Sequence, residues 1–137
     1  NNIKFKVLGD ISKFPKKLKN PINNAIKLTS KNTKLQINLA LNYGSKDEIL
    51  RSVKLMNQNK TLISIKNIEK NLYTSNMPDP DLLIRTGNTN RLSNFLLWQL
   101  SYSEIFFVKK LWPDFSKNDF NKILTKFKKI KRNYGKI

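Results

Sequence analysis

Two residue types that often carry chemistry, cysteine and histidine, are absent from all 137 residues of the chain. Without cysteine, neither a disulfide nor a thiolate nucleophile can form. Without histidine, Ser-His-Asp and Cys-His nucleophile systems are excluded, and so are zinc sites built from cysteine and histidine. We therefore expect any bound metal to be a hard cation on oxygen ligands, most simply Mg2+.

Long hydrophobic runs are also missing. No uninterrupted apolar stretch approaches the ~18 residues that a membrane-spanning helix requires. The chain begins with asparagine, and no basic segment followed by an apolar one opens it, so the sequence predicts no signal peptide. The chain has 137 residues, of which 39% are hydrophobic, so it is long enough and apolar enough to form a hydrophobic core. We expect a single domain over residues 1–137.

Acidic residues are scarce: nine stand against 27 basic ones, and the net charge is +18. Such an excess ordinarily suggests nucleic acid or an anionic surface as the partner. However, 19 asparagines and many isoleucines accompany the lysines. The codons for these three amino acids are rich in A and T, so their abundance is typical of a gene that is itself rich in A and T. We interpret most of the charge as solvated positions that have become lysine, which a phosphate-rich substrate or a lipid surface would tolerate.

Arginine is the rarer basic residue, since only four of the 27 basic residues are arginines. Two of these four, Arg85 and Arg91, lie within seven residues of each other. Where most basic positions are lysine, an arginine marks a place that needs the paired N–H donors of a guanidinium. Arg51 is expected on the exposed surface of a helix, away from this pair.

The pattern around the two arginines predicts an anion site. Residues 82–84 form a short apolar run typical of a buried strand, and Arg85 follows at its carboxyl end. A polar turn over residues 86–90 comes next, and Ser93 is placed to cap a helix predicted over residues 94–102. The free N–H groups of that helix end, its positive dipole, the guanidiniums and the Ser93 hydroxyl predict a site for a phosphate or diphosphate.

Elsewhere the pattern alternates between strands and helices. Strands are predicted over residues 3–7, 35–41, 82–84 and 105–108. A helix with Pro21 in its first turn should turn Ile22, Ala25, Ile26 and Thr29 to one side. A capping box at residues 45–48 should open a helix with Ile49, Leu50, Val53 and Met56 inward, and a short helix is expected around residues 65–72. A second box at residues 116–119 should open a last helix that buries Phe120, Ile123, Leu124, Phe127 and Ile130.

This alternation predicts an α/β fold with an open, mostly parallel sheet and flanking helices. In such sheets, ligands bind beyond the carboxyl ends of the strands. Arg85 and the turn at residues 42–44 both fall at such ends.

Residues 80–104 read PDLLIRTGNTNRLSNFLLWQLSYSE, and residues 112–115 read WPDF. This run resembles the C-terminal signature of the cis-prenyltransferases, the family of undecaprenyl diphosphate synthase. The resemblance extends weakly upstream, through residues 8–10 and 42–44. It implies that the chain is the C-terminal portion of a cis-prenyltransferase fold.

The resemblance also implies an activity: joining isopentenyl diphosphate to an allylic diphosphate, with farnesyl diphosphate expected, in the presence of Mg2+. It implies the homodimer of the family, a cytoplasmic location, contact with a membrane surface through the lipid product, and no nucleic-acid partner. The segments 95–98 and 105–108 are expected at or near the two-fold interface, and residues 112–115 as a structural turn. The positions it matches are Arg85, Arg91, Leu92 and Ser93 for substrate, and Glu104 for Mg2+.

The chain departs from the family in several places. Asn88, Thr89 and Asn90 replace a glycine, a glutamate and a frequent histidine of the loop, although asparagine tolerates left-handed backbone better than most residues. The C-terminal R-x-G triplet, which reaches the active site across the dimer in the family, aligns with Asn133-Tyr134-Gly135, and Arg132 stands one position early. The family's H-x-x-D-G-N-G-R-W-A stretch, which the resemblance implies would supply the catalytic aspartate, is missing from this sequence. We therefore expect no catalytic residue in this chain.

Three interpretations remain open. The chain is the diphosphate-binding half of a prenyltransferase, as a piece of a longer protein or a split-gene product; it is a non-catalytic subunit of a heteromeric enzyme; or it is a basic nucleic-acid-binding module. A nucleic-acid binder interleaves aromatic with basic residues. In the last predicted helix the aromatics share the apolar side and the lysines take the other, which disfavours the third interpretation.

Overall fold

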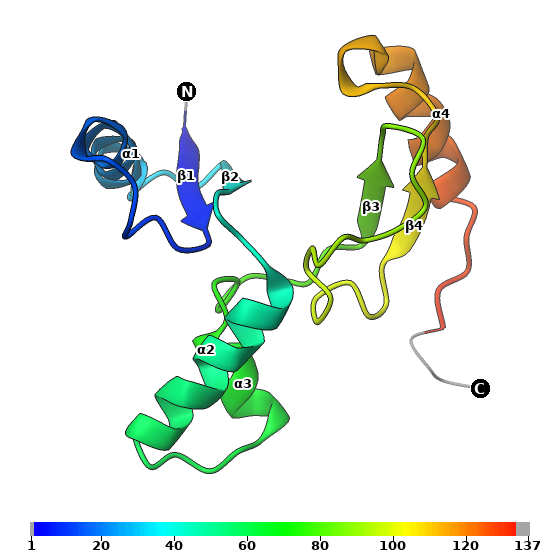
Figure 1. Cartoon of the computed structure of the whole chain (residues 1–137). Coiled ribbons are helices and arrows are strands. Elements are labelled where there is room, and N and C mark those ends of the chain that lie inside the picture. The colour runs from blue at the N-terminus through cyan, green and yellow to red at the C-terminus, as the bar shows by residue number, and fades with distance from the viewer. Residues whose placement is uncertain (1, 134–137) are drawn as a thin grey trace. The chain divides into compact units, whose positions relative to one another are not determined.

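The structure, a computed structural model, describes residues 2–133 and separates into two compact units, Asn1–Met77 and Pro78–Ile137 (Figure 1). The single domain expected over residues 1–137 therefore stays a prediction.

In the first unit, strands β1 (Ile3–Leu8) and β2 (Leu35–Ala40) pair in parallel, with Ile3 opposite Leu35 and Val7 opposite Leu39. Helix α1 (Lys16–Thr29) connects the two strands and lies against β1. Both strands were predicted. Parallel strands need such a crossover because their ends lie at opposite edges of the sheet.

Helix α1 begins earlier than predicted. Pro15 caps it, the first helical residue is Lys16, and Pro21 lies inside the helix and not in its first turn. Proline lacks an N–H group, so one helical hydrogen bond is given up within α1. The predicted side with Ile22, Ala25, Ile26 and Thr29 is the half-buried side of the helix.

Helix α2 (Ser45–Gln58) packs against α3 (Ile65–Asn71), the predicted short helix. The predicted capping box is wrong, because Gly44 is the N-cap and Ser45 is already helical and buried. Leu50, predicted to point inward, is 52% exposed. The buried stripe is mostly polar and consists of Ser45, Glu48, Ser52 and Met56. It is polar because it faces backbone groups: the Ser52 hydroxyl donates to the Ile68 carbonyl at 2.9 Å.

In the second unit, strands β3 (Leu82–Arg85) and β4 (Glu104–Phe107) also pair in parallel. A 3-10 turn, η1 (Trp112–Asp114), precedes helix α4 (Lys117–Phe127). Among the described residues of this unit, 78–133, the buried apolar side chains are Leu96, Leu100 and Ile123. All described strand pairs are thus parallel and flanked by helices, which confirms the α/β fold class.

The helix predicted over residues 94–102 is wrong. This segment is a series of turns, because Ser93, Asn94 and Leu96 have φ angles of +51°, +63° and +45°. Left-handed residues cannot continue a right-handed helix. A single helical turn survives, closed by the Leu100 N–H bond to the Leu96 carbonyl at 2.9 Å.

Helix α4 keeps its predicted start but not its predicted burial. Ser116 and Asp119 form the capping box reciprocally. Ile123 is buried, whereas Phe120 is 41% exposed and Ile130, which lies beyond the helix end, is 36% exposed. The periodicity identified the apolar side of the helix but not how much of it the unit covers.

Because of this capping box, the free energy of unfolding should depend on pH in the acid range. The Lys110 ammonium, at 2.8 Å, and the Ser116 hydroxyl and N–H group hold the pKa of Asp119 well below its ordinary value of 3.8. A carboxyl with a depressed pKa in the folded state contributes stability above its unfolded pKa and loses it as pH falls. We expect the free energy of unfolding to fall below pH ~4, and to fall less in Asp119→Asn, as measured by urea unfolding across pH. Asp114→Asn is the control; equal pH dependence in both variants would contradict the assignment.

Among residues 2–133, no helix is long and apolar enough to cross a membrane.

Candidate functional site

Arg85 ends β3, as predicted, and the polar loop that follows folds back along the end of β4. The Gly87 N–H donates to the Lys110 carbonyl at 2.8 Å, and the Asn88 N–H to the Val108 carbonyl at 3.2 Å. Gly87 and Asn88 have φ angles of +96° and +54°. Asn88, which replaces a family glycine, therefore adopts the left-handed backbone that asparagine tolerates.

The Arg85 guanidinium organises this loop. Its Nε donates to the Thr89 hydroxyl at 2.8 Å, and its Nη1 donates to the Arg91 carbonyl. Thr89 replaces a family glutamate, so this departure supplies a neutral acceptor that orients the arginine. The two bonds set the direction of the half-buried guanidinium and hold the far end of the loop against it.

Arg91 and Ser93 lie on the exposed side of the group of residues around Arg85. The Arg91 Nε group donates to the Ser93 hydroxyl at 3.2 Å. Leu92, between them, lines a pocket of about 240 Å3 together with Arg85 and four other residues, Leu83, Ile84, Thr86 and Phe95. The structure thus gathers Arg85, Arg91, Leu92 and Ser93 at the carboxyl end of β3.

The electrostatics of this cluster differ from the prediction. Ser93 has a left-handed backbone and accepts from Arg91, so it is not a helix N-cap. Without a regular helix over residues 94–102, no helix dipole supports an anion here. The positive potential comes from the two guanidiniums, each of which offers N–H donors in a planar fork that suits phosphate oxygens.

Glu104 lies elsewhere in the unit. It begins β4 opposite Leu82, whereas Arg85 lies opposite Phe107. Three residues of strand separate the two positions, a distance of roughly 10 Å. Glu104 lines a different pocket of about 240 Å3, with Tyr102, Ser103, Lys131, Arg132 and Asn133.

These surroundings do not suit a Mg2+ ion held by one copy of the chain. Within residues 2–133, no group of three or more acidic, histidine or cysteine side chains is placed to hold a metal. Glu104 is accompanied by two cations, Lys131 and Arg132, and Mg2+ prefers carboxylate and phosphate oxygens. The predicted metal role of Glu104 stays a prediction.

The C-terminal triplet is only partly described. Tyr134 and Gly135 lie outside the described residues. Arg132 forms an ion pair with Asp81 and donates to the Tyr102 carbonyl at 3.0 Å. It therefore fastens the C-terminal segment to the start of β3.

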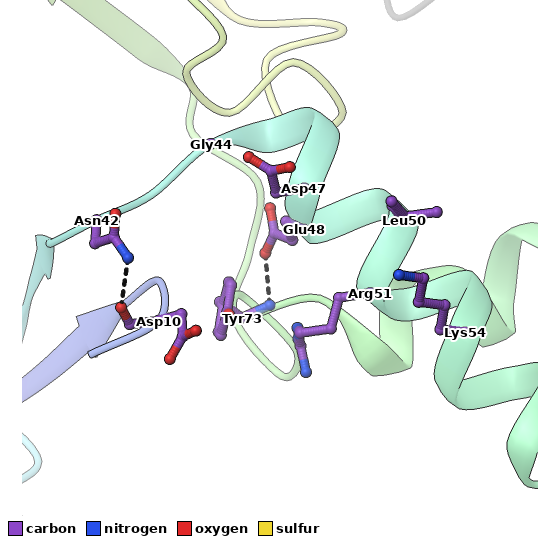
Figure 2. Close-up of a pocket in the computed structure, with 9 residues that line it drawn as sticks. All are labelled: Asp10, Asn42, Gly44, Asp47, Glu48, Leu50, Arg51, Lys54 and Tyr73. Atoms are coloured by element: carbon purple, nitrogen blue, oxygen red, sulfur yellow. Dashed lines mark hydrogen bonds between the residues drawn. The ribbon is translucent and has the colours of Figure 1, made fainter. Parts of the chain in front are cut away.

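A second pocket, of about 300 Å3, lies at the carboxyl ends of β1 and β2 in the first unit (Figure 2). The sequence analysis did not identify it as a site. The Asn42 amide donates to the Asp10 carbonyl at 2.8 Å, which joins the two strand ends. Bonds from the Ser12 hydroxyl and N–H group lower the pKa of Asp10.

Glu48, at the wall of this pocket, is 1% exposed. Its carboxylate accepts from the Tyr73 N–H at 2.6 Å, drawn in Figure 2, and from the Tyr43 hydroxyl at 2.5 Å. It therefore joins α2 to the segment after α3. Burial raises the pKa of the Tyr73 hydroxyl, because the phenolate would lose its hydration.

Arg51 is not the exposed surface residue that was predicted. It is half-buried, its guanidinium lies 4.1 Å from the centre of the Tyr73 ring, and its Nη2 donates to the Asn71 carbonyl at 2.5 Å. The scarcity of arginine, which singled out Arg85 and Arg91, was an available signal for Arg51 as well. Its planar, stacking group is again one that lysine cannot replace.

Comparisons with known proteins relate nearly the whole chain to one family. The family described as "Putative undecaprenyl diphosphate synthase" matches residues 1–135. The isoprenyl transferase of Rickettsia typhi is 43% identical over 137 residues, which cover 99% of this chain and 61% of that protein. The isoprenyl transferase of Oceanobacillus iheyensis is 43% identical over 145 residues, with 57% of that protein covered.

Two solved structures are similar over nearly the whole chain. A probable undecaprenyl diphosphate synthase from Campylobacter jejuni has a TM-score of 0.89 at 38% identity, covering 99% of this chain and 64% of that one. Lavandulyl diphosphate synthase from Lavandula x intermedia, solved in complex with dimethylallyl diphosphate, has a TM-score of 0.90 at 34% identity, covering 98% and 61%. The chain thus spans about three fifths of the length of the curated relatives it matches.

Proposed function

We propose that this chain, which belongs to the undecaprenyl diphosphate synthase family, is the part of a cis-prenyltransferase that binds the diphosphate of isopentenyl diphosphate. The observation that carries the proposal is the cluster of Arg85, Arg91, Leu92 and Ser93 around one loop. The relatives are named isoprenyl transferases. The complete enzyme would join isopentenyl diphosphate to an allylic diphosphate, with farnesyl diphosphate as the expected one.

In this proposal the chain binds and orients a substrate. The Arg91 guanidinium and the free N–H groups of Arg85 would bind diphosphate oxygens, and the Ser93 hydroxyl would add a further bond. Leu92 would contact the apolar part of the substrate. Catalytic groups would come from the two fifths of the relatives' length that this chain does not span.

Mg2+ is proposed as the cofactor of the complete enzyme, where it would neutralise diphosphate charge. Since one copy of this chain does not assemble a metal site, no reaction step is assigned to the ion. We further propose a homodimer, a cytoplasmic location with contact at the membrane surface for the lipid product, and no nucleic-acid partner.

The 137-residue chain alone should form no product from isopentenyl and farnesyl diphosphates, because a catalytic aspartate is expected outside it. Co-production with the amino-terminal part of a relative, such as the Rickettsia typhi isoprenyl transferase, should restore product; we call this complex the completed protein. The measurement is radiolabelled product formation.

The outcomes separate the interpretations. Turnover by the chain alone would show that the catalytic assignment is wrong. If the completed protein binds isopentenyl diphosphate but forms product only when a separate catalytic subunit is added, the chain is a non-catalytic subunit of a heteromeric enzyme. Binding of duplex DNA or RNA in place of diphosphate would favour the basic module.

A further inference from the structure

We infer that the loop between α2 and α3, with Leu62 and Ile63 exposed on it and Lys60 and Lys66 beside them, docks the protein on an anionic lipid surface. This inference rests on the proposed function, because it names the part of the chain that makes the membrane contact expected for a lipid product. None of these residues belongs to the proposed diphosphate site, so the two can be tested separately.

Three aliphatic side chains within four residues of this loop are exposed to solvent. Leu62 is 80% exposed, Ile63 is 66% exposed, and Ile65, the first residue of α3, is 67% exposed. Ile68, one helical turn after Ile65, is half-buried, so α3 does turn other apolar side chains towards its own unit. A single exposed leucine is ordinary in a protein, but exposed aliphatic residues that gather in one place mark an interaction surface.

Hydrogen bonds hold the backbone of this loop in one shape. The Thr61 N–H donates to the Met56 carbonyl at 2.9 Å. The side-chain amide of Asn67 donates to the Leu62 carbonyl, also at 2.9 Å. Ser64 caps α3, because its hydroxyl accepts from the Asn67 N–H at 3.2 Å. Polar groups that already have partners lose less when they leave water, so the loop can enter the boundary of a bilayer without unfolding.

The helix pair carries the loop away from the strands of its unit. Helix α2 begins at Ser45, shortly after β2 ends at Ala40, and has 14 residues, which span roughly 20 Å. Helix α3 then packs against α2. The loop thus forms the tip of the helix pair that lies far from β1 and β2, as Figure 1 shows. A tip in this position can reach a flat surface before the strands do.

The charges beside the aliphatic residues favour a lipid over a protein as the partner. Residues 57–68 include two lysines, Lys60 and Lys66, and no acidic residue, and Glu69 follows on α3. Both lysines are exposed, and within the described residues neither is paired with a carboxylate. On an anionic bilayer, the aliphatic groups enter the acyl boundary while the ammonium groups stay among the phosphates. A protein surface that covered the loop would have to supply a partner for each ammonium group.

Binding to vesicles tests the inference. The completed protein is mixed with vesicles of phosphatidylcholine, alone or together with the anionic phosphatidylglycerol, and flotation measures the bound fraction. We expect binding to the anionic vesicles. Leu62→Asn combined with Ile63→Asn should lower the partition coefficient at least about 10-fold, because two aliphatic side chains no longer leave water. Lys60→Gln combined with Lys66→Gln should lower it roughly 10- to 30-fold on the anionic vesicles.

Two controls repeat these changes on helix α1 of the same unit. Leu28 is 83% exposed, and Leu28→Asn should affect vesicle binding much less than the loop substitutions do. Lys16→Gln combined with Lys17→Gln removes two exposed charges, as the loop variant does, and should also have the smaller effect. All the substituted side chains are exposed, so urea unfolding should show that every variant remains folded.

Three results would overturn the inference. The first is a completed protein that does not bind anionic vesicles. The second is an equal loss of binding in the α1 and loop variants, which would show an attraction spread over the whole basic surface. The third is binding by the 137-residue chain but not by the completed protein, which would show that the added part covers the loop. In each case, a completed protein that binds isopentenyl diphosphate leaves the proposed function standing. Loop-dependent vesicle binding by a completed protein that binds no isopentenyl diphosphate would overturn the proposed function alone.

Discussion

Replacing Arg85 with lysine should weaken isopentenyl diphosphate binding to the completed protein by roughly 10- to 100-fold. The substitution keeps the positive charge but loses the guanidinium fork that contacts Thr89 and Arg91 and that, in the proposed function, would bind diphosphate oxygens. One hydrogen bond to a charged group contributes about 1.5–3 kcal/mol, and about 1.4 kcal/mol corresponds to one decade of affinity. Calorimetry gives the dissociation constant. Arg91→Lys should have a similar effect, since Arg91 offers the same donors beside Ser93.

The matched comparison is Arg51→Lys, the same chemical change in the other unit. It should leave the dissociation constant unchanged and lower the free energy of unfolding by about 1–2 kcal/mol, because the stacking on Tyr73 and the bond to the Asn71 carbonyl are lost. Arg85→Lys should differ from Arg51→Lys by lowering the affinity, in addition to whatever stability its bonds to Thr89 and Arg91 contribute. If all three variants change affinity equally, the cluster around Arg85 is not the diphosphate site.

Replacing Glu48 with alanine should destabilise the chain by about 2–4 kcal/mol. Its buried carboxylate accepts from the Tyr73 N–H and the Tyr43 hydroxyl, and both donors would lose this acceptor in a partly dry environment. Each unsatisfied donor costs about 1–3 kcal/mol, with half-buried groups towards the lower end. Urea unfolding of the completed protein measures the change.

Asp47→Ala is the control for Glu48→Ala. Asp47 is the preceding residue of α2, also lies in its first turn, and is exposed. Both substitutions remove one negative charge near the helix start, so their dipole contributions are similar. A loss of stability in Asp47→Ala as large as that in Glu48→Ala would show that charge near the helix start, and not the buried hydrogen bonds, is responsible.

The order of elements could be predicted from the sequence because it follows from local patterns. Alternating apolar residues marked β1 and β2, and a capping box marked the start of α4. The substrate cluster was also predictable, because Arg85, Arg91, Leu92 and Ser93 are close in the chain. A short loop leaves such residues few ways to lie apart.

Predictions from local sequence patterns were wrong in the segment after Ser93 and at the start of α2. The apolar run after Ser93 has the composition of a helix, but left-handed residues turn the chain at Ser93, Asn94 and Leu96. Ser45 and Glu48 have the spacing of a capping box, yet Gly44 caps α2, and Glu48 is drawn inward by Tyr43 and Tyr73. At Glu48, the bond from the Tyr73 N–H, a residue distant in the sequence, outweighed a capping preference of less than a few kcal/mol.

The sequence by itself thus determined the strands and every helix except the one expected over residues 94–102, and that two arginines and a serine meet at the carboxyl end of β3. Only the tertiary structure decided where Glu104 lies relative to them, because strand register depends on pairing between residues distant in the chain. It likewise decided that Arg51 is partly buried and Glu48 fully buried, since their partners are Asn71, at the end of α3, and Tyr73, in the segment that follows. The periodicity of apolar residues in a segment reflects its own secondary structure, whereas contacts between distant segments form only when the chain folds.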